Sequence, residues 1–160
     1  MTSTGNNTCV AVADNVTITF APSPIVNAGI DQTVCGNNAQ VNLNGFINFA
    51  LGGQWSGGLG SYAPNATTLS TAYTPSNDEI ANGFVELTLT SSGNGSCLPV
   101  SDIVHIDITP APVISIVEGD QPCTNNPSFD ASATYTVAGG VQWSGNGVFS
   151  PSTNSNNITY

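Results

Sequence analysis

The chain has 160 residues, with ten acidic side chains, one histidine and neither lysine nor arginine, so its formal net charge is -10. Because phosphate neutralisation requires lysine or arginine, this composition excludes nucleic-acid binding and electrostatic attraction to anionic lipid. No apolar run is long enough to cross a bilayer, so membrane insertion is not expected. Hydrophobic residues make up 39% of the chain, and their alternation with polar residues favours a folded β protein over disorder.

The chain contains two copies of one sequence pattern. The stretch GGQWSG at 52–57 recurs as GGVQWSG at 139–145, and Trp143 lies 88 residues after Trp55. A repeat of this length is too long for a solenoid unit and matches a complete β-sandwich domain. Other residues with the same offset are Cys9 and Cys97, Cys35 and Cys123, and Pro22 and Pro110. After the tryptophan the offset falls to 87, so that Tyr160 matches Tyr73.

Residues 1–21 correspond to 89–109 in this repeat. Val16, Ile18 and Phe20 alternate with polar residues, which predicts a half-buried strand, and 101–109 has the same pattern. Each of these strands ends in Pro-x-Pro, a stiff extended connection that marks a domain boundary. We therefore divide the chain into the terminal strand of a preceding repeat (1–21), a complete repeat (22–109) and a truncated second repeat (110–160).

The complete repeat contains about seven short strands. They are expected within 25–34, with a break at Ala28 and Gly29, and near 41–44, 54–56, 62, 67–73, 85–90 and 101–109. Ser76 and Glu79 have the spacing of a capping box, and Gly83 is a stop signal, so one helical turn is expected between them. Short strands with a tryptophan on the third predict an all-β fold, a tandem array of immunoglobulin-like sandwiches.

Three stretches carry a resemblance to a known group of repeats. VNAGIDQTV at 26–34, QWSG at 54–57 and TPSxxEIAxG at 74–83 resemble the PKD-like and immunoglobulin-like repeats of very large Bacteroidota cell-surface proteins, including gliding-motility adhesins of the SprB type. The resemblance implies a stalk or adhesin at the cell surface, secreted through the type IX pathway. The second copy departs from the pattern at 118–122. The resemblance supplies no catalytic residues, and we expect no enzymatic activity.

The four cysteines raise the question of disulfides, which persist in exported proteins. Cys35 and Cys97 belong to the same complete repeat, and a disulfide between them is the favoured prediction. In an immunoglobulin topology, however, the turns that carry them lie at opposite poles. Two alternatives therefore stay open: a bond from Cys35 to the next repeat, through the equivalent of Cys97, and four free thiols.

The titratable side chains do not form a recognisable catalytic or metal-binding pattern. His105 is interpreted as a solvated strand residue, since a catalytic base would need a nucleophile and an orienting partner. No cofactor is expected. The acidic residues are interpreted as solvated, although calcium binding is a lesser alternative because carboxylates are its preferred ligands. The calcium candidates are Asp31, Asp78, Glu79, Asp102 and Asp120.

Trp55 and Trp143 are predicted to be core residues, with stacking on sugars as the alternative. The function predicted is an extracellular structural or adhesive module in a stalk or fibre, whose partners are neighbouring repeats and surface glycans. The alternative is a carbohydrate-binding module of a secreted enzyme.

The two ends carry apolar strand positions, Val16, Ile18 and Phe20 at one end and Phe129 and Trp143 at the other. Open edges recruit strands. We therefore expect either that the native chain continues in both directions or that 1–21 of one molecule adds to 110–160 of another. The second route produces a filament.

Overall fold

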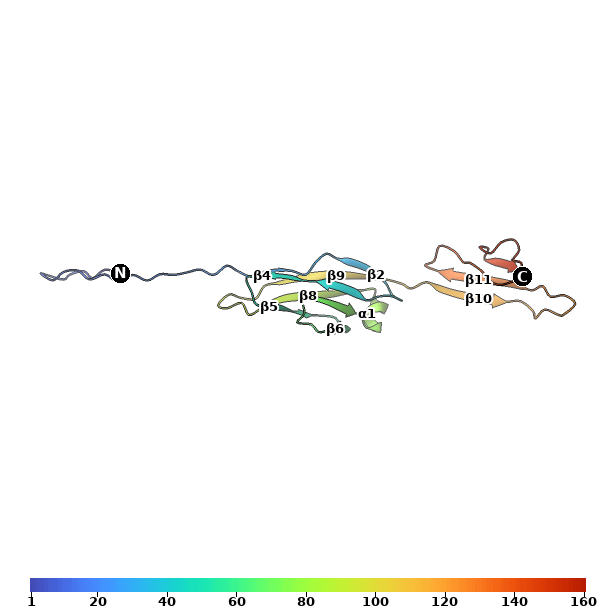
Figure 1. Cartoon of the computed structure of the whole chain (residues 1–160), viewed down its shortest axis with the longest axis horizontal. Helices are drawn as coiled ribbons and strands as arrows, with labels where there is room; N and C mark the ends of the chain where they lie inside the picture. Colours follow the sequence, from blue (N-terminus) through green and yellow to red (C-terminus); the bar gives the residue numbers. More distant parts are fainter.

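The computed structural model describes residues 1–160, and it contains twelve β-strands and one short helix. Three parts follow one another along the long axis of the molecule (Figure 1): an extended N-terminal segment, a central sandwich and a smaller C-terminal sheet. No helix has the length and hydrophobicity that crossing a membrane would require.

The central sandwich is built from two layers of strands. One layer has the order β2 (Gln32–Cys35), β9 (Ser101–Thr109), β8 (Phe84–Ser92) and β5 (Gly52–Ser56). The other contains β3 (Val41–Asn44), β7 (Ser70–Thr74) and β6 (Ser61–Ala63) in that order, and a separate pair of β1 (Ile25–Asn27) and β4 (Phe46–Asn48). Neighbours are antiparallel, except that β2 runs parallel to β9.

Alternating apolar residues of both layers fill the space between them. Leu87 and Leu89 of β8 and Val104 and Ile106 of β9 are fully buried, and they belong to one cluster with Trp55 and the inward residues of the facing strands. Period-two alternation places these side chains on a single face of each strand. The prediction of an all-β, immunoglobulin-like sandwich is therefore confirmed.

The one helix, α1 (Asn77–Asn82), begins and ends where the sequence predicts. The Ser76 side chain accepts from the backbone nitrogen of Glu79, the Glu79 side chain accepts from the backbone of Ser76, and the capping box is complete. Gly83 ends the helix in the left-handed region at φ 84°, where glycine meets no Cβ penalty.

One predicted strand begins later than expected. The strand expected from Thr67 starts only at Ser70, because the preceding residues form a turn around Asn65. The Asn65 side-chain oxygen accepts from the backbone nitrogens of both Thr67 and Thr68, each at 3.0 Å. Such Asx turns compete with ladder pairing.

The C-terminal sheet repeats the strand pairing of the sandwich. It consists of β10 (Val113–Glu118), β11 (Asp130–Thr136) and β12 (Asn157–Thr159). The pair Val26 and Ile47 of β1 and β4 recurs as Ile114 and Tyr135. Likewise, the pair Asn42 and Ala72 of β3 and β7 recurs as Asp130 and Thr159. The repeat in the sequence is therefore also a repeat in hydrogen-bond register.

Residues 1–21 do not form the expected strand in this structure. The segment has one isolated bridge, between Thr2 and Ala13, and no strand. Val16, Ile18 and Phe20 are 84%, 72% and 89% exposed, whereas their equivalents on β9 are buried. The physical reason is that a strand needs neighbours to pair with. β9 is hydrogen-bonded to both β8 and β2, whereas no strand of this chain is hydrogen-bonded to residues 15–21.

Candidate functional site

The buried carboxylate of the sandwich belongs to Glu79, which is only 5% exposed. The hydroxyl of Tyr73 donates to its two oxygens at 2.8 and 3.0 Å. The backbone nitrogens of Leu59 and Ser76 donate at 2.8 and 2.7 Å. The Tyr73 oxygen itself accepts from the backbone nitrogen of Gly60 at 2.9 Å. These contacts connect α1, β7 and the loop after β5.

Hydrogen bonding keeps this buried carboxylate ionised. Burial alone would raise the pKa of Glu79, but the hydrogen bonds from Ser76, Leu59 and Tyr73 outweigh burial and hold the pKa below its usual 4.5. Burial, followed by the hydrogen bond to Glu79, raises the pKa of the Tyr73 phenol well above its ordinary value. Burial and the charge of Glu79 raise the pKa of Tyr62 to about 12. The Glu79 carboxylate is therefore a buried negative charge that uncharged hydrogen-bond donors stabilise.

The interpretation of Glu79 as a solvated carboxylate was wrong. The capping box, which the sequence does show, already brings the Glu79 side chain back to the Ser76 backbone. The contact with Tyr73, which encloses the carboxylate from the other side, has no such signal in the sequence. The remaining calcium candidates do not assemble around it: no group of three His, Cys, Asp or Glu side chains is arranged to hold a metal ion.

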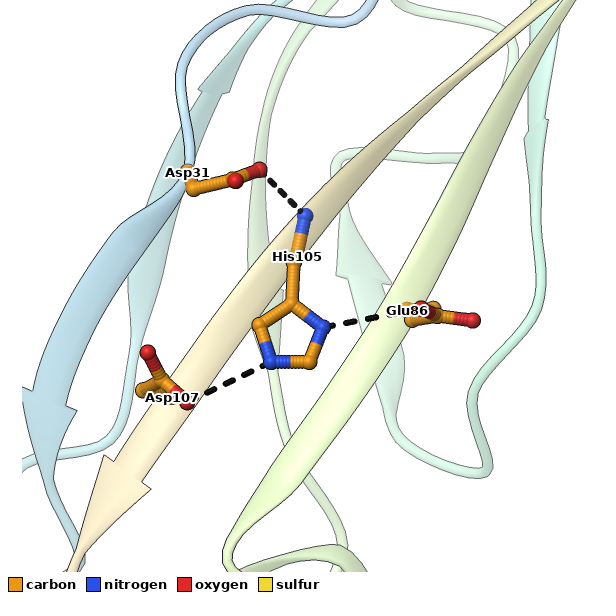
Figure 2. Close-up of polar contacts among 4 residues, drawn as sticks. All are labelled: Asp31, Glu86, His105 and Asp107. Carbon is orange, nitrogen blue, oxygen red and sulfur yellow. Dashed lines mark hydrogen bonds and ion pairs between the residues drawn. The ribbon is translucent and has the colours of Figure 1, made fainter.

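The only histidine lies on the outward face of the β8–β9 pair. Figure 2 shows its ring between two carboxylates, with Nδ1 3.6 Å from Glu86 and Nε2 3.3 Å from Asp107. Its backbone nitrogen donates to Asp31 at 2.8 Å, and its ring stacks on Phe84. The His105 side chain is 35% exposed. This arrangement supports a local ion pair on protonation of the ring, and it contains no nucleophile for the histidine to activate.

All four cysteines are free thiols in this structure, and Cys35 is not paired with Cys97. Cys35 ends β2 and lies opposite Thr109, the last residue of β9. Cys97 precedes Ser101, the first residue of β9. Nine strand residues cover about 27 Å, whereas a disulfide needs Cα atoms within about 7 Å. The two thiols therefore lie at opposite poles, and the geometry opposes the favoured intra-repeat bond.

The two tryptophans differ in exposure. Trp55 is 1% exposed, and its indole nitrogen donates to the carbonyl oxygen of Leu69 at 3.2 Å. The indole of Trp143 donates to the carbonyl oxygen of Ser155 at 2.7 Å, but this side chain is only partly buried. It borders a hollow of about 240 Å³ that also contains Phe129 and Tyr160. Trp55 offers no ring face to a sugar.

Comparison with known proteins finds weak structural similarity. No known protein family matches the sequence, and no curated protein matches it. Extracellular cadherin domains 3–6 of protocadherin gamma B2 are similar at 10% identity and a TM-score of 0.42, over 85% of this chain and 38% of that one. Domains 1–4 of protocadherin gamma B7 are similar at 14% identity and a TM-score of 0.37, over 86% and 40%. The chain thus spans about two fifths of these structures, and likenesses this weak define neither family nor function.

Proposed function

We propose that this chain is a segment of an extracellular fibre or stalk built from tandem β-sandwich repeats, with a structural or adhesive role. In this proposal residues 22–109 are one complete repeat, 1–21 correspond to the last strand of the preceding repeat, and 110–160 are the first part of the following one. The neighbouring repeats are the principal partners.

The observation that carries this proposal is the recurrence of one hydrogen-bond register in two successive bodies. The pairing of β1 with β4 and of β3 with β7 is repeated by β10, β11 and β12 at the sequence offset. The two bodies follow one another along the long axis (Figure 1) with a short linker between them. Units that repeat along one direction, each with its own sheet, suit a protein that spans distance.

The surface chemistry fits a place outside the cell. The chain has no lysine or arginine, so its exposed polar surface consists of amides, hydroxyls and carboxylates. The resemblance to repeats of Bacteroidota surface proteins supports the finer part of the proposal, which is secretion by the type IX pathway and a role in adhesion, as in gliding-motility adhesins. Surface glycans are the proposed adhesive partners.

Exposed apolar positions support self-association as a further part of the proposal. Val16, Ile18 and Phe20 are largely exposed, although their equivalents Val104, Ile106 and Ile108 are buried. At the other end, Ile114 and Ile116 of β10 are 57% and 55% exposed. A strand from one molecule that adds to this sheet in another would cover both surfaces and extend the assembly without closing it.

The test of a spacer is its length. Chains that contain one or two additional copies of residues 22–109, inserted after Thr109, are measured by small-angle X-ray scattering beside the original chain. A fibre segment gains an equal increment of maximum dimension with each copy at constant cross-section. A particle that becomes rounder instead would contradict the proposal.

The carbohydrate-binding alternative has its own readout. A glycan array probed with the original chain and with Trp143→Ala distinguishes the two functions. Binding that disappears in the variant, while its melting temperature is unchanged, would favour the carbohydrate-binding module. Trp143 is the informative residue because Trp55 is enclosed in the core.

A further inference from the structure

Two thiols lie against the two linkers of the central sandwich. The sulfur of Cys97 is 3.6 Å from the carbonyl oxygen of Pro22, where the chain enters the sandwich. The sulfur of Cys35 is 3.9 Å from the carbonyl oxygen of Pro110, where the chain leaves it. Pro110 is the equivalent of Pro22 at the offset of 88 residues. The same linker oxygen is thus approached by a different cysteine at each end of the sandwich.

In consecutive repeats these two contacts converge on one atom. At the linker that begins with Pro110, the preceding sandwich supplies Cys35, and the following sandwich supplies the equivalent of Cys97. When both contacts are kept, both sulfurs border the carbonyl oxygen of Pro110. Their separation is then no larger than the sum of the two contact distances, so rotation about the side-chain bonds can bring them together.

The local turns that hold these thiols recur in both copies. The backbone nitrogen of Asn38 donates to the carbonyl oxygen of Cys35 at 2.8 Å, and the same bond joins Asn126 to Cys123 at 2.9 Å. A second pair of matching backbone hydrogen bonds holds the turn of the other type of cysteine. The backbone nitrogen of Cys97 donates to the carbonyl oxygen of Asn94 at 3.1 Å, and that of Cys9 donates to the carbonyl oxygen of Asn6 at 2.9 Å. Each repeat therefore presents one thiol of each type in a fixed turn.

We propose that Cys35 of one repeat forms a disulfide with the equivalent of Cys97 in the next repeat, across the linker between them. This inference rests on the proposed function, because it needs consecutive repeats and an oxidising extracellular space. The two thiols lose two protons and two electrons as the sulfur–sulfur bond forms. A small or protein disulfide accepts them and is released as two thiols.

This pairing accounts for the four free thiols. The counterparts of Cys35 and Cys123 belong to the repeats that follow them, and those of Cys9 and Cys97 belong to the repeats that precede them. No two of the four cysteines are counterparts of one another, because Cys35 would pair with a residue 88 positions after Cys97. The absence of a bond in this chain and the presence of one in an array follow from the same geometry.

The test completes the second repeat. Residues 74–109 are appended after Tyr160, the equivalent of Tyr73, so that the extended chain contains one junction between two full sandwiches. The protein is equilibrated with glutathione disulfide, alkylated without denaturation, and digested with pepsin at acidic pH, since trypsin has no site here. Mass spectrometry is expected to find Cys35 linked to the cysteine of the appended segment, with Cys9, Cys97 and Cys123 alkylated.

Two variants serve as controls. Cys35→Ser removes the linked peptide, whereas Cys9→Ser leaves its yield unchanged, because Cys9 is the same type of cysteine as Cys97 but lies outside this junction. Cys35 that is alkylated, or linked to Cys97, overturns the inference. Hydrogen exchange separates the two proposals. If the appended segment is protected but Cys35 is free, the inference fails and the fibre proposal stands, whereas an unprotected segment with free Cys35 counts against both.

Discussion

The hydroxyl of Tyr73 donates to both carboxylate oxygens of Glu79, at 2.8 and 3.0 Å, and this buried pair connects β7 to α1. The chain has no lysine or arginine to neutralise the carboxylate. Backbone and hydroxyl donors therefore take over the stabilisation of a charge that ion pairs provide in most proteins.

Replacing Glu79 with glutamine is expected to reduce the free energy of unfolding by roughly 1–3 kcal/mol. The glutamine amide group presents a donor where Ser76, Leu59 and Tyr73 also present donors, so at least one hydrogen bond is lost. Chemical denaturation measures the effect. Asp78→Asn is the matched control, because Asp78 is the exposed neighbour on the same helix and its loss should change stability little. Equal effects of the two substitutions would contradict the assigned role.

The pH dependence of stability should carry a signature of Glu79. Its folded pKa lies below the usual 4.5, so the unfolded chain binds the proton more readily. The contribution of Glu79 is thus fully present above about pH 4.5 and is lost as the pH falls through the folded pKa. The difference in melting temperature between the original chain and Glu79→Gln should shrink below about pH 4.5. A difference that is constant from pH 7 to pH 3 would argue against an ionised carboxylate.

Gly58 is expected to be intolerant of alanine. It has φ +69°, and an added Cβ would meet the Tyr73 hydroxyl and lie 2.8 Å from Glu79. Backbone strain costs about 1 kcal/mol, and disruption of the Tyr73–Glu79 pair adds roughly 1–3 kcal/mol. Gly95→Ala separates these causes, because Gly95 has φ +62° with open space around it. Thermal melts should show a clearly larger drop in melting temperature for Gly58→Ala than for Gly95→Ala. Similar drops would mean that backbone strain alone explains the effect and that the Tyr73–Glu79 pair is not disrupted.

The two tryptophans should respond differently to truncation. Trp55→Ala removes a side chain that is 1% exposed, and the expected loss is about 3–5 kcal/mol. Trp143→Ala removes a partly exposed side chain from the smaller sheet and should leave the unfolding of the sandwich unchanged. Differential scanning calorimetry of each variant beside the original chain measures the unfolding of the sandwich. A small effect at Trp55 would mean that the sandwich core does not depend on it.

The exposed apolar segment predicts concentration-dependent association. Phe20 is 89% exposed and Val10 is 87% exposed, but only Phe20 belongs to the alternating stretch that matches β9. Light scattering of the original chain should increase with concentration, and Phe20→Asp should suppress the increase while Val10→Asp does not. A chain that stays monomeric at every concentration would exclude strand addition between copies.

The repeat offset allowed most of the sandwich to be predicted from the sequence, because alternation and turn residues agree in both copies. The helix was predictable for a different reason: Ser76, Glu79 and Gly83 carry local signals that need no tertiary information. What escaped prediction depends on distant partners. Nothing near Tyr73 in the sequence indicates that its hydroxyl reaches Glu79, and the alternation in residues 15–20 does not by itself form a strand without neighbouring strands.

The sequence also indicated how the cysteines are placed. Their turns were predictable, since Gly and Asn surround both types. Their separation was also indicated, since the immunoglobulin topology places the two turns at opposite poles, and β9 spans the sandwich between them. The topology therefore opposes the intra-repeat bond, whereas the bond to the next repeat stays a proposal.

The position of Cys35 and Cys97 at opposite poles has a mechanical consequence. If disulfides cross the linkers, a pulling force passes through the bond from Cys35 to the equivalent of Cys97 in the next repeat. From that cysteine the force follows the backbone to the next cysteine of the Cys35 type, a stretch equivalent to Cys97–Cys123, where another disulfide begins. That stretch covers 26 positions, or about 90 Å when fully extended. The rest of each sandwich lies in covalent loops that bear no load. A domain that unfolds under shear would then leave the contour length unchanged, and the fibre would behave as an inextensible tether.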